Sequence, residues 1–270
     1  MVKKLLKHEF IYYFRSFGLF LPIVLVIGVM ARVFECFDNG ETINNIIIGS
    51  ANLMLVVSCG ALLVLSSVAG IVRFYKNMFS AEGYLTFTLP VTNQEHIFVK
   101  LVAAVAFEAA CVIVVLLTGM VALAGEDLET FWLGIRSFYT LMALDVGDAN
   151  MIGYIVEFLL LTVVSGISGM LLYYACIAIG QTAKKHRILK AILAYFVWYI
   201  ITQAASTLYL VVLMVMGEMG RLDSSLEWIV NNPYGAIHVY FWGSILLTAG
   251  VGALFWFVTQ KIMTKKLNLE

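Results

Sequence analysis

The chain has 270 residues, of which 62% are hydrophobic and 13% are charged, and its formal net charge at pH 7 is zero. Soluble domains carry about 25% charged residues, so this composition excludes an ordinary globular protein with a water-exposed surface. The mean hydropathy of +0.94 favours a membrane protein instead. Four cysteines without a C-x-x-C motif or a Cys/His cluster predict neither a disulfide framework nor a metal site.

Residues 1–16, MVKKLLKHEFIYYFRS, form the first predicted element. Lys3, Lys4, Lys7 and His8 lie mostly off one helical stripe of apolar side chains. That stripe consists of Val2, Leu5, Leu6, Phe10, Tyr13 and Phe14. Basic amphipathic helices with aromatic residues lie in the plane of the membrane interface. We therefore predict an interfacial helix here. The alternative is a basic flank that only sets the orientation of the first span.

Six apolar runs follow, each close to or longer than the length of about 20 residues that crosses a bilayer core. They cover residues 17–34, 46–72, 101–124, 152–180, 191–216 and 239–259. The runs lack the alternation of barrel strands, and a helix satisfies its own backbone hydrogen bonds in lipid. The predicted fold class is therefore an all-α polytopic membrane protein, with six transmembrane helices in a single domain over residues 1–270.

The segments between these runs differ in charge, and the difference predicts the topology. Fourteen of the 17 Lys and Arg residues fall on one side of the predicted membrane: Lys3, Lys4, Lys7, Arg15, Arg73, Lys76, Lys100, Lys184, Lys185, Arg187, Lys190, Lys261, Lys265 and Lys266. The acidic residues crowd the opposite loops. The positive-inside rule makes the basic side cytoplasmic, so both termini are predicted to lie inside.

The inner segment 73–92 lies between the second and third runs. Thr92 and Glu95 have the spacing of a capping box, and Pro90 keeps the residue before it extended. The third helix is therefore predicted to begin near Asn93. The residues from Arg73 onward would then form a short inner excursion with room for one small helix, rich in aromatic side chains and poor in charge.

Two outer elements are also predicted to be helical. Residues 125–150 are acidic and contain FWLGIRSFY, a pattern that favours a helix at the outer interface. Within residues 217–238, a capping box at Ser224 and Glu227 is followed by the sequence NNP. That order predicts a short helix that ends in a turn just before the last span.

The sequence contains no catalytic constellation. The P-loop pattern, H-E-x-x-H and G-x-S-x-G are all absent, and the four histidines are scattered, so we expect a chain that is not an enzyme. Two carboxylates, Glu108 and Glu157, fall inside the spans, where a central charge costs about 2.5–3.5 kcal/mol. Both are candidates for a substrate pathway. The alternatives are a hydrogen-bonded contact between helices for Glu108 and an interfacial position for Glu157.

The stretch RFYKNMFSAEGYLTFTLPVTNQEHIFVKLV, which begins at Arg73, resembles the segment between the second and third spans of ABC-2-type transporter permeases. The resemblance is strongest to the exporters of Gram-positive bacteria. The matching positions are Arg73, Phe74, Glu82, Gly83, Tyr84, Leu85, Thr88, Leu89, Pro90 and Lys100. The architecture of the whole chain is also similar to that family, with an interfacial N-terminal helix and six spans.

The resemblance implies that residues 73–92 form a coupling helix, seated in a groove of a separate ABC ATPase subunit. The residues that this role implies are Arg73, Phe74, Lys76, Phe79, Glu82, Tyr84 and Leu85. Two ATPases and two permeases, expected to be a homodimer, would form the working unit. ATP and Mg would bind the partner ATPase, with no cofactor on this chain and no nucleic-acid partner. The alternative is that the segment packs against the inner ends of its own helices.

The function that the resemblance implies is export across a bacterial plasma membrane. The expected substrate is amphipathic, either an antimicrobial or cytolytic peptide or a hydrophobic drug, which would give antimicrobial peptide resistance. Export of lipid-linked material is an alternative cargo. An ATP-independent secondary carrier or channel is the alternative class, although the two halves of the sequence show no convincing repeat.

Overall fold

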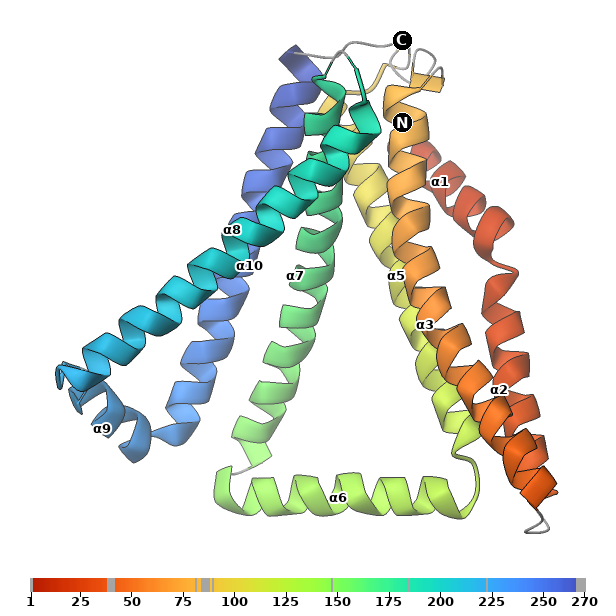
Figure 1. Ribbon diagram of the computed structural model, residues 1–270, viewed down its shortest axis with the longest axis vertical. Coiled ribbons are helices and arrows are strands. Elements are labelled where there is room, and N and C mark those ends of the chain that lie inside the picture. The colour runs from red at the N-terminus through yellow and green to blue at the C-terminus, as the bar shows by residue number, and fades with distance from the viewer. Residues whose placement is uncertain are drawn as a thin grey trace. The chain divides into compact units, whose positions relative to one another are not determined.

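The computed structural model describes residues 2–37, 42–80, 82–83, 88, 90–146, 148–183, 185–221 and 223–265. These residues contain helices and no strand (Figure 1). The helices are α1 (Val2–Phe17), α2 (Phe20–Cys36), α3 (Thr42–Phe79), α5 (Asn93–Ala122), α6 (Glu126–Val146), α7 (Asp148–Gln181), α8 (Arg187–Glu218), α9 (Asp223–Asn231) and α10 (Pro233–Lys265). Five of them are long and apolar enough to cross a membrane, or six if the bent pair α1 and α2 forms one span. The predicted all-α, multi-pass character is thereby confirmed.

The helix α3 extends beyond its predicted span at both ends. Its 38 residues correspond to about 57 Å at 1.5 Å per residue, which is longer than a bilayer core of about 30 Å. The sequence predicts that the inner excursion begins at Arg73, and the structure shows that the first residues of this excursion continue α3 as far as Phe79. The membrane boundary at Arg73 stays a prediction. The helix continues because Phe74 and Met78, one turn apart, are both fully buried.

The start of α5 agrees with the prediction from the capping box. The backbone N–H of Glu95 donates to Thr92 Oγ1 over 3.4 Å, and the backbone N–H of Thr92 donates to Glu95 Oε2 over 2.9 Å. These two bonds satisfy backbone donors that have no partner within the first helical turn. The helix therefore begins at Asn93, as predicted.

A break at Gly18 separates α1 from α2, and the two helices are bent by 43° (Figure 1). The backbone N–H of Gly18 donates to the carbonyl of Phe14, and a Cβ atom at Gly18 would collide with that same oxygen. Only glycine fits this close approach of the chain to itself. The helix predicted over residues 1–16 is confirmed, and its position at a membrane interface stays a prediction.

The chain divides into two compact units, Met1–Thr140 and Leu141–Glu270. The helix α6 carries the chain from the first unit into the second. The single transmembrane domain predicted over residues 1–270 stays a prediction.

In the first unit, α2, α3 and α5 pack on one another and α1 packs on α5 (Figure 1). The buried face of α2 is a stripe of Val24, Gly28 and Ala31. At Gly28 the helices approach so closely that a Cβ atom would lie 2.5 Å from Thr118 Cγ2 of α5. The small residue thus permits tight packing, as is usual between membrane helices.

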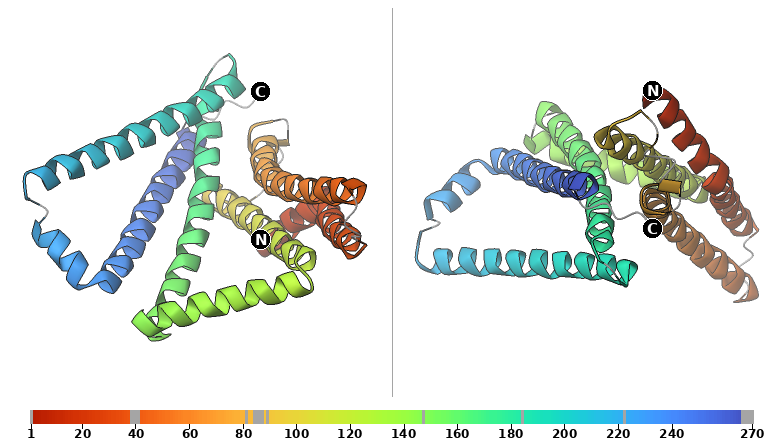
Figure 2. Two further views of the ribbon diagram at one scale, coloured as in Figure 1. Left: turned by 60° about the horizontal axis from the view of Figure 1, so that its bottom comes forward. Right: turned by 90° about the horizontal axis from the view of Figure 1, so that it is seen from above.

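In the second unit, α7 packs along α10, and α8 packs mainly on α7. Figure 2 shows α8 diverging from α7 and α10, with α9 connecting its far end to the start of α10. No residue of α8 is buried. Trp198 of α8 still contacts Phe255 of α10, with an edge-to-face geometry and 4.8 Å between the ring centroids.

The helices predicted in the two outer loops are both present, as α6 and α9. The predicted cap of α9 is displaced, because α9 begins at Asp223 and Ser224 lies inside the helix. The single residue Asn232 then separates α9 from α10, whose first residue is Pro233. Proline is favoured at that position because the first turn of a helix needs no N–H donor.

Candidate functional site

The candidate site starts from a carboxylate on the buried face of α1. Leu5, Glu9 and Tyr13 follow one another at four-residue spacing, so they lie on one face of the helix. Glu9 is 4% exposed and Tyr13 is completely buried, where its ring stacks on Phe107 of α5 with 5.2 Å between the centroids. An ionised carboxylate in such a position is costly unless it is paired.

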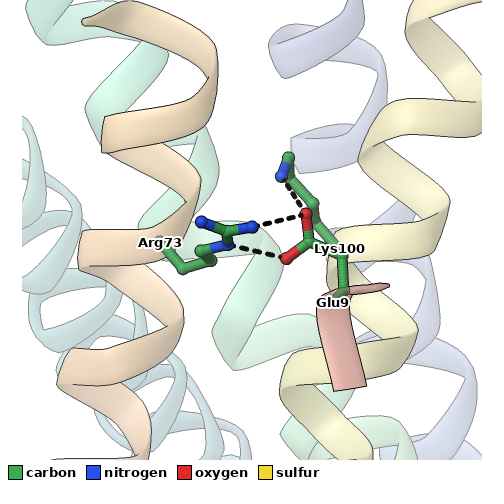
Figure 3. Close-up of polar contacts among 3 residues, drawn as sticks. All are labelled: Glu9, Arg73 and Lys100. Atoms are coloured by element: carbon green, nitrogen blue, oxygen red, sulfur yellow. Dashed lines mark hydrogen bonds and ion pairs between the residues drawn. The ribbon is translucent and has the colours of Figure 1, made fainter. Parts of the chain in front are cut away.

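Two cations from different helices pair with Glu9 (Figure 3). From α3, Arg73 Nε donates to Glu9 Oε2 over 2.8 Å, and Arg73 Nη2 lies 3.4 Å from Oε1. From α5, Lys100 Nζ donates to Oε1 over 2.7 Å. We call Glu9, Arg73 and Lys100 the ion cluster, and it joins three helices at one carboxylate.

The surroundings of the ion cluster strengthen these contacts. Lys100 is only 1% exposed, so water screens its attraction to Glu9 weakly. The ion cluster holds two cations and one carboxylate, and the guanidinium carbon of Arg73 lies 3.7 Å from the centre of the Tyr12 ring, which is a cation–π contact. Removing one partner from a buried ion pair costs about 3–5 kcal/mol, because the remaining charge stays buried without compensation.

The protonation of Glu9 follows from the same surroundings. Glu9 precedes the first predicted span, which starts at residue 17. Burial alone would raise the pKa of the Glu9 carboxyl, but Lys100 and Arg73 together lower the pKa below its ordinary value. Glu9 is therefore ionised at neutral pH, and its bonds to the two cations are charge-assisted.

The ion cluster lies at the two helices that flank the predicted coupling segment. Arg73 is the first residue of that segment and lies in the last two turns of α3, and Lys100 is in the second turn of α5, eight residues after the segment ends. Glu9 is separated from these cations by 64 and 91 residues along the sequence. The first residue of the segment and the helix that follows the segment are thus connected to α1 through one side chain.

Sequence reasoning identified Arg73 and Lys100 but missed Glu9. A signal for Glu9 was present, because it is the one acidic residue among the first 34 and lies within the apolar stripe of a basic helix. A carboxylate on the buried face of an amphipathic helix predicts a cation in the element that covers it. The sequence alone does not tell which of the 17 Lys and Arg residues this would be.

The structure separates the predicted coupling residues into groups. Phe74 and Phe79 are buried, and their ring centroids lie 5.8 Å apart, so they pack within their own unit. This packing agrees with the alternative interpretation for those two side chains. Lys76 and Glu82 are exposed. Tyr84 and Leu85 lie outside the described residues. The coupling role of the set as a whole stays a prediction.

Glu108, the first substrate-pathway candidate, lies on α5 in the first unit. Its side chain is partly buried, and Ser67 Oγ of α3 donates to Glu108 Oε1 over 3.2 Å. This bond matches the interhelical contact that the sequence analysis gave as the alternative. A role for Glu108 in a substrate pathway stays a prediction.

Glu157, the second candidate, lies on α7 in the second unit and is 7% exposed. His238 Nδ1 of α10 lies 2.8 Å and 2.9 Å from the two carboxylate oxygens of Glu157. The ring of Tyr154 is 4.5 Å from the His238 ring, and the Tyr154 hydroxyl donates to the backbone carbonyl of Tyr234 over 3.0 Å. The structure thus brings together a histidine and a carboxylate that the sequence analysis treated as unrelated.

The described contacts at these sites are ion pairs and hydrogen bonds between helices. Among the described residues, no group of three or more His, Cys, Asp or Glu side chains could hold a metal ion. The ion cluster can hold helix ends together or release them when its geometry changes.

No family model, curated protein or solved structure matches the chain.

Proposed function

We propose that this chain is the permease subunit of an ATP-binding cassette exporter of the ABC-2 type. In this proposal it moves an amphipathic substrate out of a bacterial cell, using ATP that a separate ATPase subunit hydrolyses. The resemblance of the segment after Arg73 supports this function. The set of apolar helices and a sequence without a P-loop agree with it.

The observation that carries the proposal is the ion cluster, which joins α1 to the first residue of the proposed coupling segment and to the helix after it. If a partner ATPase binds residues 73–92, its movement during ATP hydrolysis would shift the end of α3 and the start of α5. Because Arg73 and Lys100 share Glu9, that movement would also reach α1, and α1 meets α2 at a bend. Packed helices respond to such a push by rigid-body shifts rather than by gradual deformation.

The partners and cargo of the proposed exporter follow from the same resemblance. Two ATPases would bind a pair of identical permeases, and ATP and Mg would be held by the ATPases. The chain contains 12 methionines and 31 phenylalanines and tyrosines. Helices with these side chains suit an amphipathic peptide or a hydrophobic drug better than a sugar. Glu108 and Glu157 are the candidates for contact with this cargo.

The proposal is tested by ATP hydrolysis in proteoliposomes that contain the chain and the ATPase that co-purifies with it. We expect Lys76→Ala and Glu82→Ala each to reduce the permease-stimulated rate about fivefold, since both side chains are exposed and an anchoring interface residue is worth more than about 1 kcal/mol. Lys185→Ala, which removes an exposed cation from another loop, is the matched control and should leave the rate unchanged. Wild-type rates for both segment variants would contradict the coupling role.

A second candidate function, an ATP-independent secondary carrier, is favoured by the contact between Glu157 and His238. Ionisable pairs inside membrane proteins often belong to proton or ion pathways. If this candidate held, the purified chain alone would move a fluorescent amphipathic peptide into liposomes under a pH gradient, and Glu157→Gln would abolish the movement. The exporter proposal predicts no uptake until the ATPase and ATP are added.

A further inference from the structure

The helix α1 has a second, positively charged face opposite the ion cluster. No described residue pairs with the charges of this face. Glu9 and Tyr13 mark the buried face. The exposed side chains on the other side are Lys3, Lys4, Lys7, Ile11, Phe14 and Arg15. At 100° per residue these six fall within about a third of the helix circumference, centred opposite Glu9 and Tyr13. We call them the basic face of α1.

The charges of the basic face are available for a ligand. None of Lys3, Lys4, Lys7 and Arg15 forms a hydrogen bond or an ion pair with a residue that the structure describes. The one carboxylate of α1, Glu9, points to the opposite side and is already shared by Arg73 and Lys100. The basic face therefore carries four cations and no compensating anion within its own helix.

The basic face also carries two apolar side chains that water does not favour. Ile11 is 48% exposed and Phe14 is 50% exposed, and both lie among the cations. The Phe14 ring contacts Phe107 of α5 in an edge-to-face geometry, with 6.0 Å between the centroids, and half of Phe14 stays exposed. Cations that surround exposed aliphatic and aromatic groups suit a membrane surface, where the apolar groups enter the acyl boundary and the cations reach the headgroups. An acidic protein surface would match the charge but would not need the two exposed apolar groups that lie among the cations.

We propose that the basic face of α1 binds the headgroups of anionic phospholipids. The phosphates of these lipids would pair with Lys3, Lys4, Lys7 and Arg15, while Ile11 and Phe14 enter the boundary of the acyl chains. Because the ion cluster fixes the opposite face of α1 to α3 and α5, lipid binding holds the helix between the membrane surface and the ends of those helices. Anionic lipid thus acts as a ligand of the chain. This inference does not require the proposed ATPase.

The test is amide hydrogen exchange of residues 2–17 in the full chain, reconstituted in lipid nanodiscs. One set contains phosphatidylcholine alone, and the other contains an equimolar mixture of phosphatidylcholine and phosphatidylglycerol. A cation close to an anionic surface contributes about a fivefold gain in binding, so exchange in α1 should be at least about fivefold slower with phosphatidylglycerol. High salt should remove the difference, because salt screens exposed charges.

Two triple variants separate this site from a general attraction of cations to the membrane. Lys3→Gln with Lys4→Gln and Lys7→Gln should abolish the effect of phosphatidylglycerol on α1. Lys185→Gln with Lys190→Gln and Lys261→Gln removes the same charge from other exposed positions and should keep the effect. Equal exchange of wild-type α1 in both lipids would overturn the proposal. Equal protection of α1 by phosphatidylglycerol in the Lys3, Lys4 and Lys7 variant would overturn it as well.

Discussion

Replacing Glu9 with Gln is expected to lower the free energy of unfolding by about 3–5 kcal/mol, because Lys100 would then stay buried and Arg73 partly buried without a counter-charge. The substitution preserves the shape of the side chain, so the loss reports the charge rather than a cavity. The measurement is the free energy of unfolding in detergent micelles, followed by the loss of helical circular dichroism.

The control for this prediction is an ion pair that is more exposed. Arg32 and Glu35 are 3.0 Å apart within α2, and their side chains are 25% and 27% exposed. Pairs of this kind contribute about 0–1 kcal/mol, so Glu35→Gln should cost little. A loss for Glu9→Gln no larger than that for Glu35→Gln would contradict the buried ion cluster.

A double-mutant cycle assigns the effect to the contact with Lys100. Lys100→Met removes the second cation and leaves Arg73 to neutralise Glu9. The combined variant Glu9→Gln with Lys100→Met should lose less stability than the sum of the two single variants, by about 1–3 kcal/mol. Additive losses would mean that the two side chains do not interact.

Replacing Gly28 with Ala is expected to destabilise the first unit by about 1–3 kcal/mol, the usual cost of overpacking. The new Cβ atom would lie 2.5 Å from Thr118 Cγ2, so α2 would have to move away from α5. Thr118→Ser removes the methyl group that collides, so the double variant Gly28→Ala with Thr118→Ser should regain most of the lost stability. The measurement is the midpoint of thermal unfolding of the two single variants and the double variant, each compared with wild type.

Another glycine serves as the control for Gly28. Gly119 lies in the same region of α5, and a Cβ atom there would meet nothing within 4 Å. Gly119→Ala should therefore be neutral or slightly stabilising, since alanine has the higher helix propensity. If Gly28→Ala behaved like Gly119→Ala, the close contact between α2 and α5 would be wrong.

The features that the sequence predicted correctly depend on local pattern. The apolar runs predicted the long helices, and the spacing of Thr92 and Glu95 predicted the first residue of α5. A capping box is formed by residues three apart, so no tertiary information is needed to recognise it. The helices α6 and α9 followed in the same way from composition and turn residues.

The features that the sequence did not predict depend on contacts between distant residues. Glu9 meets Lys100 across 91 residues, and Glu157 meets His238 across 81. Taken alone, Lys100 has a simpler interpretation as a charge that sets the topology. His238 alone is one of four scattered histidines. The charge of Arg73 predicts the end of a membrane span but not the end of the helix, and α3 continues to Phe79 with Arg73 paired to Glu9.

The most direct test of the proposed function is photo-cross-linking from the coupling segment in intact cells. A photoreactive amino acid is placed at Lys76 or Glu82, both exposed, and at Phe131 of α6, which is exposed and predicted to lie on the other side of the membrane. We expect Lys76 and Glu82 to be cross-linked to a polypeptide with a P-loop, and Phe131 not to be. Cross-links from Lys76 and Glu82 to the chain itself alone would contradict an energy-supplying partner at this segment.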